Sequence, residues 1–296
     1  MRTGRTEDPV SSDFTAISEV RAAVAPGAGL QADDAAIRGS DRSSPVPPER
    51  EDTLTVVVGD SLWEQHAPWW QEGFTDGADP EYEDQILPLI DQFLPGARRV
   101  LDVGCGEGQV SRRIAGLGAQ VVGLDPTAAQ IDAAQERGGQ PRFIRARSEQ
   151  IPSPNASFDA VVLCLALEHV DPFEPAIDEV ARVLAPGGRF LLFLAHPLLQ
   201  SPGSGWVDDE NSGDHFWRVG PYLQDAVEID EIAPGVQLQF AHRPLSRYVH
   251  AMGGVGLLVE DMVEPRPPAA VLVETADFPN AVTIPRFMLL CARRLG

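Results

Sequence analysis

From residue 99 onward, short apolar runs alternate with segments whose apolar residues recur at helical spacing. The apolar runs, which we expect to be strands, cover residues 99–103, 121–124, 143–146, 158–163 and 189–194. The helical patterns between them cover 109–117, 128–137 and 173–184. Strands that are apolar along their whole length are buried on both faces, as in a parallel sheet covered by helices. The pattern therefore predicts an α/β fold with a mostly parallel sheet and helices on both faces.

The rhythm is different on either side of this alternating segment. Before it, apolar residues at helical spacing over 82–94 predict a helix, which Pro95 and Gly96 end. After it, residues 196–241 are polar, non-repetitive and rich in Pro, Gly and Asp. A long insertion of this kind in a compact domain is usually functional, and often a lid. A helix over 244–252 and strands over 257–263 and 283–292 are predicted to complete the fold.

The beginning of the chain has a different composition. Residues 1–55 are rich in Ala, Ser, Pro, Gly, Asp and Arg, which is typical of a disordered segment. We therefore expect a disordered tail over 1–55 and an N-terminal helical cap over 56–98. A ligand-binding domain over 99–296 follows, with a cap insertion at 196–241.

Composition narrows the classes of function. The formal net charge is −21, and all 23 basic residues are Arg. So acidic a protein repels phosphate backbones, which argues against nucleic acid as a partner. There is neither an apolar run of about 18 residues nor an apolar leader, so we expect a cytoplasmic protein without a membrane partner. The three cysteines are far apart and form no CxxC pair, so we expect free thiols and no zinc site.

The first predicted strand leads into the turn Asp102-Val-Gly-Cys-Gly-Glu-Gly108. Gly104, Gly106 and Gly108 let the backbone pass close to a ligand, because no Cβ intrudes. The free N–H groups at the start of the following helix suit an anionic group, such as the carboxylate of S-adenosylmethionine. Dinucleotide-binding turns place their third glycine one residue later, where this chain has Gln109. The spacing therefore favours S-adenosylmethionine over NAD.

The second predicted strand ends at Asp125, which is followed by Pro126. A carboxylate about twenty residues beyond the glycine turn can accept hydrogen bonds from both hydroxyls of a ribose. Asp125 therefore supports a cofactor that contains a ribose, without deciding which one.

Five segments together carry a resemblance to a known family: 100–108, 122–125, 157–162, 168–170 and 182–188. They resemble the small-molecule class I S-adenosylmethionine-dependent methyltransferases, a group that includes quinone O-methylases and unassigned actinobacterial members. The likeness extends from about Trp63 to Leu295. It implies a Rossmann-like sheet of seven strands whose last strand is antiparallel, with S-adenosylmethionine as cofactor. It also implies methyl transfer to a small molecule, with a hydroxyl oxygen as the first choice and nitrogen or carbon as alternatives.

The resemblance also implies roles for individual residues. Asp102 would hold the ammonium of the cofactor, Ser148 and Glu149 would lie along its adenine, and the backbone at 164–165 would meet its methionine part. The sequence departs from the family pattern at Arg147. Family members commonly have an Asp at this position, which accepts a hydrogen bond from adenine, whereas Arg cannot accept one. The expected cofactor residues are Asp102, Gly104, Cys105, Gly106, Gly108, Asp125, Pro126, Ser148, Glu149, Cys164 and Leu165.

Two histidines are candidates for the chemistry. His169 and His196 each follow a predicted strand, at the carboxyl edge where open α/β sheets bind ligands. Either could act as a general base toward a hydroxyl or orient the acceptor. Each also has a structural alternative, as a helix cap or a packed side chain. Some relatives bind Mg²⁺ through Glu-x-x-Glu-His, but Leu165 stands at the first Glu position here, so we expect no metal.

The five tryptophans all lie in the two segments that are expected to cover the site. Aromatic side chains there either line a pocket for the acceptor or anchor the cap to the sheet. We assign Trp63 to the anchoring role and Trp206 to the pocket.

Two other classes of function are left open by the sequence. A nicotinamide-dependent oxidoreductase would share the ribose carboxylate but is disfavoured by Gln109. A non-catalytic S-adenosylmethionine-binding protein would keep the cofactor site and use its cap to contact a partner.

Overall fold

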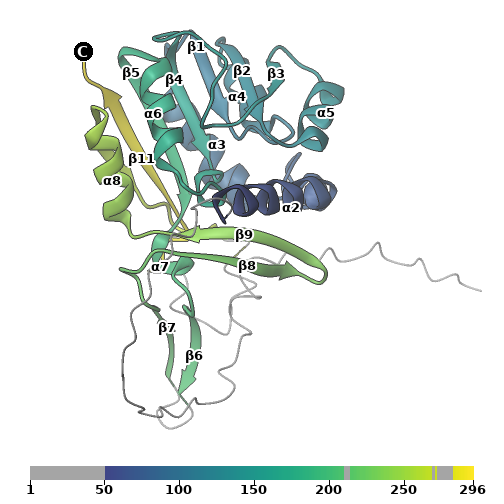
Figure 1. Cartoon of the computed structure of the whole chain (residues 1–296), viewed down its shortest axis with the longest axis vertical. Helices are drawn as coiled ribbons and strands as arrows, with labels where there is room; N and C mark the ends of the chain where they lie inside the picture. Colours follow the sequence, from purple (N-terminus) through teal and green to yellow (C-terminus); the bar gives the residue numbers. More distant parts are fainter. Residues whose placement is uncertain (1–50, 210–213, 269–270, 272–282) are drawn as a thin grey trace, which may run out of the picture.

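The structure is a computed structural model in which residues 51–209, 214–268, 271 and 283–296 are described. Figure 1 shows the arrangement of its main elements. They are α2 (Glu51–Gly73), η1 (Tyr82–Ile86), α3 (Leu87–Phe93), β1 (Arg99–Val103), α4 (Gln109–Gly116), β2 (Gln120–Asp125), α5 (Ala128–Arg137), β3 (Arg142–Arg145), β4 (Phe158–Cys164), η2 (Leu167–His169), α6 (Glu174–Val183), β5 (Leu184–Ala195), α7 (Pro197–Gln200), β6 (Gly205–Asp209), β7 (Asp214–Arg218), β8 (Ala226–Ala233), β9 (Val236–His242), α8 (Leu245–Gly254), β10 (Leu257–Val263) and β11 (Phe287–Arg294).

The central sheet has seven strands in the order β10-β11-β5-β4-β1-β2-β3. The neighbours among β1 to β5 pair in parallel. β11 runs antiparallel to both β5 and β10. The predicted Rossmann-like, mostly parallel sheet with an antiparallel last strand is therefore confirmed.

The sheet is buried on both faces, as the continuous apolar runs predicted. Leu101 and Val103 of β1 pack with buried residues of α6 and α8 on one face. Val100, from the same strand, packs with α3 and α4 on the other. Successive side chains of a strand point to opposite faces, so each apolar strand contributes to two cores.

The segments around the core depart from the predictions in three places. The helix predicted over 82–94 is divided into the π-helix η1 and the α-helix α3. The insertion at 196–241 contains the short helix α7 and two hairpins, β6–β7 and β8–β9, which the sequence did not predict. Of the expected tail, residues 1–50 lie outside the described residues, and α2 already begins at Glu51.

Helix α2 lies between the sheet and the β8–β9 hairpin (Figure 1). The carboxylate of Glu64 accepts hydrogen bonds from the backbone N–H groups of Ala128 (2.7 Å) and Ala129 (3.0 Å), the first residues of α5. On the other side, the N–H of Gln237 in β9 donates to Nε2 of His66 at 3.4 Å. α2 is thus fixed over the end of the sheet where the predicted cofactor residues lie. Within the described residues, no helix is both long and apolar enough to cross a membrane.

A buried arginine holds the turn that follows β4. The guanidinium of Arg243, which is 3% exposed, donates to the carbonyl oxygens of Leu167 (3.4 Å) and Val170 (2.6 Å) and to Asp171 (2.7 Å). It also lies over the ring of Phe173, 4.6 Å from the ring centre. These contacts fix η2, the short helix that carries His169.

We predict that Arg243→Met destabilises the protein by about 2–4 kcal/mol, because two buried carbonyls and the Asp171 carboxylate lose their donor. Arg247→Met is the matched control, since Arg247 is more than two-fifths exposed and pairs with Glu174 and Asp225 at the surface. Its expected cost is about 0–1 kcal/mol. Urea unfolding measures both, and equal losses would contradict the assigned role of Arg243.

Candidate functional site

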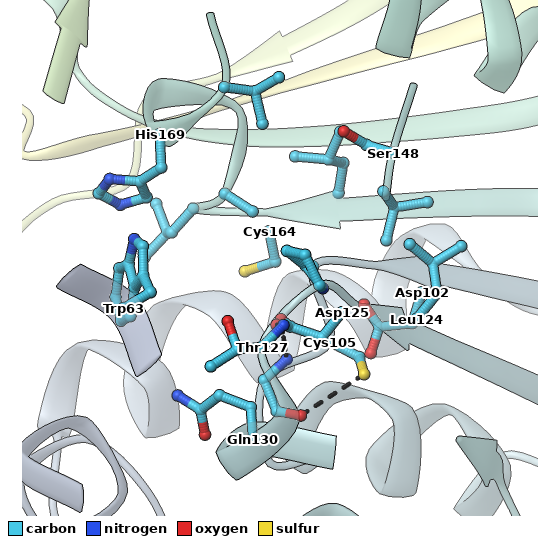
Figure 2. Close-up of a pocket in the computed structure, with 18 of the residues that line it drawn as sticks. Trp63, Asp102, Cys105, Leu124, Asp125, Thr127, Gln130, Ser148, Cys164 and His169 are labelled. Atoms are coloured by element: carbon cyan, nitrogen blue, oxygen red, sulfur yellow. Dashed lines mark hydrogen bonds between the residues drawn. The ribbon is translucent and has the colours of Figure 1, made fainter. Parts of the chain in front are cut away.

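A cavity lies where the carboxyl ends of β1, β2 and β4 meet α2 (Figure 2). Its lining includes every expected cofactor residue except Gly108, and it also includes His169. His196 is not part of the lining. The lining residues come from turns far apart in the sequence, which the parallel strands bring to one edge of the sheet.

The glycine turn forms one wall of the cavity. The N–H groups of Gly104 and Cys105 both donate to the carbonyl of Leu124, at 2.8 and 2.9 Å. Gly104 has φ = +71°, and a Cβ there would lie 2.4 Å from the Cβ of Ala166. Gly108 has φ = +88°, and its Cβ would lie 2.5 Å from the ring of Phe143. Glycine at position 104 therefore allows the turn to approach Ala166, just after β4. Glycine at position 108 is required instead because Phe143 packs against it, outside the cavity.

Asp125 connects this turn to the next one. One oxygen of its carboxylate accepts from the N–H of Gly106 at 3.0 Å, and the other accepts from the N–H of Thr127 at 2.8 Å. Burial raises the pKa of Asp125, while these two N–H groups act in the opposite direction. The carboxylate lines the cavity, and each of its oxygens has a further lone pair with which it can accept a hydrogen bond from a ribose hydroxyl.

Asp102 is a buried carboxylate with one oxygen unsatisfied. Its Oδ2 accepts from the hydroxyl of Ser111 at 2.6 Å, whereas Oδ1 has no hydrogen-bond partner. Burial raises the pKa of Asp102 to about 7, and the nearby charges of Glu107 and Asp125 contribute. An unpaired carboxylate oxygen in a buried site is costly unless a cation or donor meets it.

The start of α4 differs from the expectation. We expected its free N–H groups to receive the carboxylate of the cofactor, but Oε1 of Glu107 accepts from the N–H of Gln109 at 3.0 Å. The same oxygen lies 3.5 Å from Arg112 and 3.6 Å from Arg137. The N–H of Gln109 is therefore already bonded to the side chain of Glu107. An acidic side chain at this place is stabilised by the partial positive charge of the helix N-terminus.

The loop after β3 meets α2 at the opposite wall. The guanidinium of Arg147 forms ion pairs with Asp60 of α2 and with Glu149, the latter at 3.1 Å. The hydroxyl of Ser148 donates to Glu149 at 2.7 Å. Arg147 is thus held by carboxylates on two sides, and it joins the predicted adenine loop to the helical cap.

His169 lines the cavity beside α2. Its Nδ1 lies 2.7 Å from the carbonyl oxygen of Gln239 in β9, and its ring contacts Trp63 and Phe240. A carbonyl can only accept, so Nδ1 carries the proton and Nε2 keeps its lone pair. Burial lowers the pKa of His169 to about 4, so the ring is neutral at physiological pH.

His196 has a different environment. It caps the short helix α7, where its Nδ1 accepts from the N–H of Leu198 at 3.2 Å. Its Nε2 lies 2.9 Å from the carboxylate of Glu264. Both ring nitrogens are therefore engaged away from the cavity, in the structural role that the sequence left open.

The structure bears out the anchoring role of Trp63, which packs against the β8–β9 hairpin as well as lining the cavity, but not the pocket role of Trp206. Trp63 lines the cavity, as does Trp70. Trp206 instead faces Trp217 directly across the β6–β7 hairpin, with ring centres 5.5 Å apart, and is not in the cavity lining. Sequence reasoning also missed two lining residues, Asp60 and Gln239. Helical spacing from Trp63 could have indicated Asp60, whereas no pattern in the sequence points to Gln239.

The lining suits a cationic cofactor with a ribose. Six carboxylates face it against one Arg, and the described lining carboxylates are Asp60, Asp102, Glu107, Asp125, Glu149 and Asp171. S-adenosylmethionine carries a sulfonium and an ammonium, and the unpaired oxygen of Asp102 offers the ammonium an acceptor. The pyrophosphate of NAD would face carboxylates instead of free N–H groups. No group of three His, Cys, Asp or Glu side chains that could hold a metal ion occurs in the part of the chain that the structure describes.

Comparison with known proteins leads to the same class. The methyltransferase domain family matches residues 101–192. An uncharacterised methyltransferase of Mycobacterium tuberculosis is 33% identical over 198 residues, which cover 67% of this chain and 76% of the relative. The human mitochondrial ubiquinone biosynthesis O-methyltransferase is 27% identical over 255 residues, covering 73% of this chain and 69% of that protein. The crystal structure of an S-adenosylmethionine-dependent methyltransferase from Mesorhizobium loti has a TM-score of 0.62 and 28% identity, covering 74% of this chain and 99% of that one.

The fold and the site thus define an enzyme that uses S-adenosylmethionine as its methyl donor. The chain belongs to the class I S-adenosylmethionine-dependent methyltransferases.

We predict that Asp125→Ala weakens binding of S-adenosylhomocysteine by about 1–3 kcal/mol, because a ribose would lose charge-assisted hydrogen bonds. Calorimetric titration measures the change. Asp159→Ala is the matched control: its carboxylate also accepts from two backbone N–H groups, those of Arg98 and Arg99, but it does not line the cavity. Unchanged affinity in the Asp125 variant would contradict the ribose assignment.

A second prediction concerns pH. Because the pKa of Asp102 is about 7 in the free enzyme, the carboxylate that a cofactor ammonium needs is present above pH 7 and is lost as the pH falls. Affinity for S-adenosylhomocysteine, whose ammonium stays protonated over this range, should therefore rise between pH 6 and 8, by at most about tenfold per pH unit.

Asp102→Asn is the control for this pH dependence, since it removes the titrating group and keeps the acceptor for Ser111. The variant should bind more weakly and nearly independently of pH. Glu168 also has a pKa of about 7, but it is not part of the cavity lining. A pH dependence that survives in Asp102→Asn would assign it to another group.

Proposed function

We propose that this methyltransferase methylates a hydroxyl oxygen of a small molecule, with His169 as the group that accepts the hydroxyl proton. The observation that carries the proposal is the hydrogen bond from Nδ1 of His169 to the carbonyl of Gln239. It fixes the ring in the tautomer whose Nε2 can accept a proton, on a side chain that lines the cofactor cavity.

The reaction requires that the acceptor oxygen be held in line with the methyl group, and that a group nearby accept the hydroxyl proton. S-adenosylmethionine supplies an electrophilic methyl group, which passes to the acceptor oxygen while the carbon–sulfur bond breaks. As that oxygen attacks, its proton moves to Nε2 of His169, and the hydrogen bond to Gln239 orients the ring for this transfer. Because the pKa of His169 is about 4, Nε2 is unprotonated throughout the neutral range. Because the ring is then a weak base, the proton moves to it during the attack on the methyl group and not before it.

Two further facts support a small hydroxyl acceptor. The human relative described above is an O-methyltransferase of ubiquinone biosynthesis, according to its name. The net charge of −21 and the acidic cavity lining disfavour polyanions such as nucleic acids.

A direct test is a screen of phenols, quinols, hydroxy acids and amines with S-adenosylmethionine labelled in its methyl group. We expect label to be transferred to hydroxyl compounds, and mass spectrometry to locate it on oxygen. Transfer to amines alone, or to carbon, would overturn the assignment of the acceptor atom.

With an acceptor from that screen, we predict that His169→Ala lowers kcat at saturating cofactor by about 10²- to 10⁴-fold, the usual contribution of a positioned base. Affinity for S-adenosylhomocysteine serves as the test that the site is intact, and it should change little.

His196→Ala is the matched control, because it removes a buried histidine that caps α7 and pairs with Glu264. This variant should lose stability and keep its kcat. If kcat were lost only in the His196 variant, the role of the base would have to be assigned to His196 instead of His169.

A further inference from the structure

Four ring side chains line one part of the cavity, and three pairs among them meet edge to face. Trp63 and Trp70 have ring centres 5.6 Å apart and planes at 75°. Trp70 meets Tyr82 at 6.2 Å and 80°, and Trp63 meets His169 at 4.9 Å and 79°. Edge-to-face contact is the ordinary packing of aromatic side chains. These four rings, called the aromatic cage below, differ from core rings in that all of them line the cavity, where ring faces attract alkylated cations.

Helix α2 builds the main part of this cage. Trp63 and Trp70 are seven residues apart, which is two helical turns, so they project from the same face. Trp70 lies over the glycine turn, with its Nε1 4.0 Å from the position of a Cβ on Gly106. Phe74, which also lines the cavity, stacks on Trp70 at 4.5 Å with planes 14° apart and holds it in place. Figure 2 shows Trp63 beside His169 at the edge of the cavity.

The charges on this side of the cavity are already neutralised. The carboxylate of Asp60 is paired with Arg147, and that of Asp171 is paired with Arg243. His169 donates to a backbone carbonyl and is uncharged, so it does not repel a cation. None of these three groups therefore offers a free negative charge to a cation beside the rings, whose faces carry negative potential.

A sulfonium is suited to such a site for a chemical reason. It carries a full positive charge on an alkylated sulfur and has no N–H or O–H to donate. Hydrogen-bond acceptors therefore cannot recognise it, but the negative face of an aromatic ring attracts it. After methyl transfer the sulfur is a neutral thioether, and this attraction is lost.

We propose that Trp63 and Trp70 form a cation–π site for the sulfonium of S-adenosylmethionine, by which the enzyme binds the methyl donor in preference to its demethylated product. The role concerns the cofactor, so it holds whichever atom of the acceptor receives the methyl group.

The test compares two ligands that differ in this charge. Calorimetric titration of the full-length enzyme with S-adenosylmethionine and with S-adenosylhomocysteine gives the ratio of the two affinities. In Trp63→Leu and in Trp70→Leu, we expect this ratio to fall by about 3- to 30-fold, the range of a desolvated cation–π contact. The Phe variants keep a weaker ring and should show a smaller fall.

Two controls separate charge recognition from shape. Trp69→Leu removes the same ring from the same helix. Trp69 packs against the β8–β9 hairpin, as Trp63 does, but it does not line the cavity, so the ratio should not change. Sinefungin carries an amine cation near the position of the sulfonium, and its affinity should fall together with that of S-adenosylmethionine.

The proposal is overturned if both Leu variants bind S-adenosylmethionine and S-adenosylhomocysteine more weakly by the same factor, which would show that the rings provide only shape. It is also overturned if the affinities do not change. If a Leu variant fails to fold, which loss of S-adenosylhomocysteine binding and of the circular dichroism spectrum would reveal, the corresponding Phe variant decides the question by the same ratio.

Discussion

The carboxylate of Asp125 holds two turns of the site at once, because it accepts from the N–H groups of Gly106 and Thr127. These turns follow adjacent parallel strands, so their free N–H groups meet at one edge of the sheet. A buried carboxylate is costly unless such donors surround it. Asp102 and Glu107 lie in the same region, and burial raises the pKa of each. The sheet thus concentrates negative charge where a cationic cofactor can complete the balance.

Helix α2 depends on these same turns for its position. Glu64 caps the start of α5, directly after the turn that Asp125 holds. On its other side, α2 packs against β9, whose Gln239 carbonyl orients His169. The wall that carries Trp63 and the histidine that it contacts are therefore positioned by the hairpin and the sheet together. A change in the hairpin would affect His169 and the aromatic wall at the same time.

The sheet could be predicted from the sequence because each of its central strands is a continuous apolar run, which is typical of a strand buried on both faces. Helix α5 was predicted with its observed bounds, 128–137. The glycine turn was predictable because its conformation requires particular residues, as at Gly104. The hairpin β8–β9 was missed because its outward positions include Val227 and Ile229, which are more than two-fifths exposed and hide the alternation of a half-buried strand. Trp206 was wrongly assigned to the pocket because the sequence does not show that it faces Trp217 across a hairpin.

The arrangement of charge in the cavity also has a chemical logic. The methyl carbon of a sulfonium is an electrophile, so a free carboxylate within its reach would compete with the acceptor as a nucleophile. The carboxylates of Asp60 and Asp171 are instead occupied by arginines. Aromatic rings attract the same cation without offering a lone pair of comparable reactivity. A site that places carboxylates at the glycine turn and rings beside His169 can therefore bind a donor with two cationic groups without bringing the paired carboxylates of Asp60 and Asp171 to its methyl group as nucleophiles.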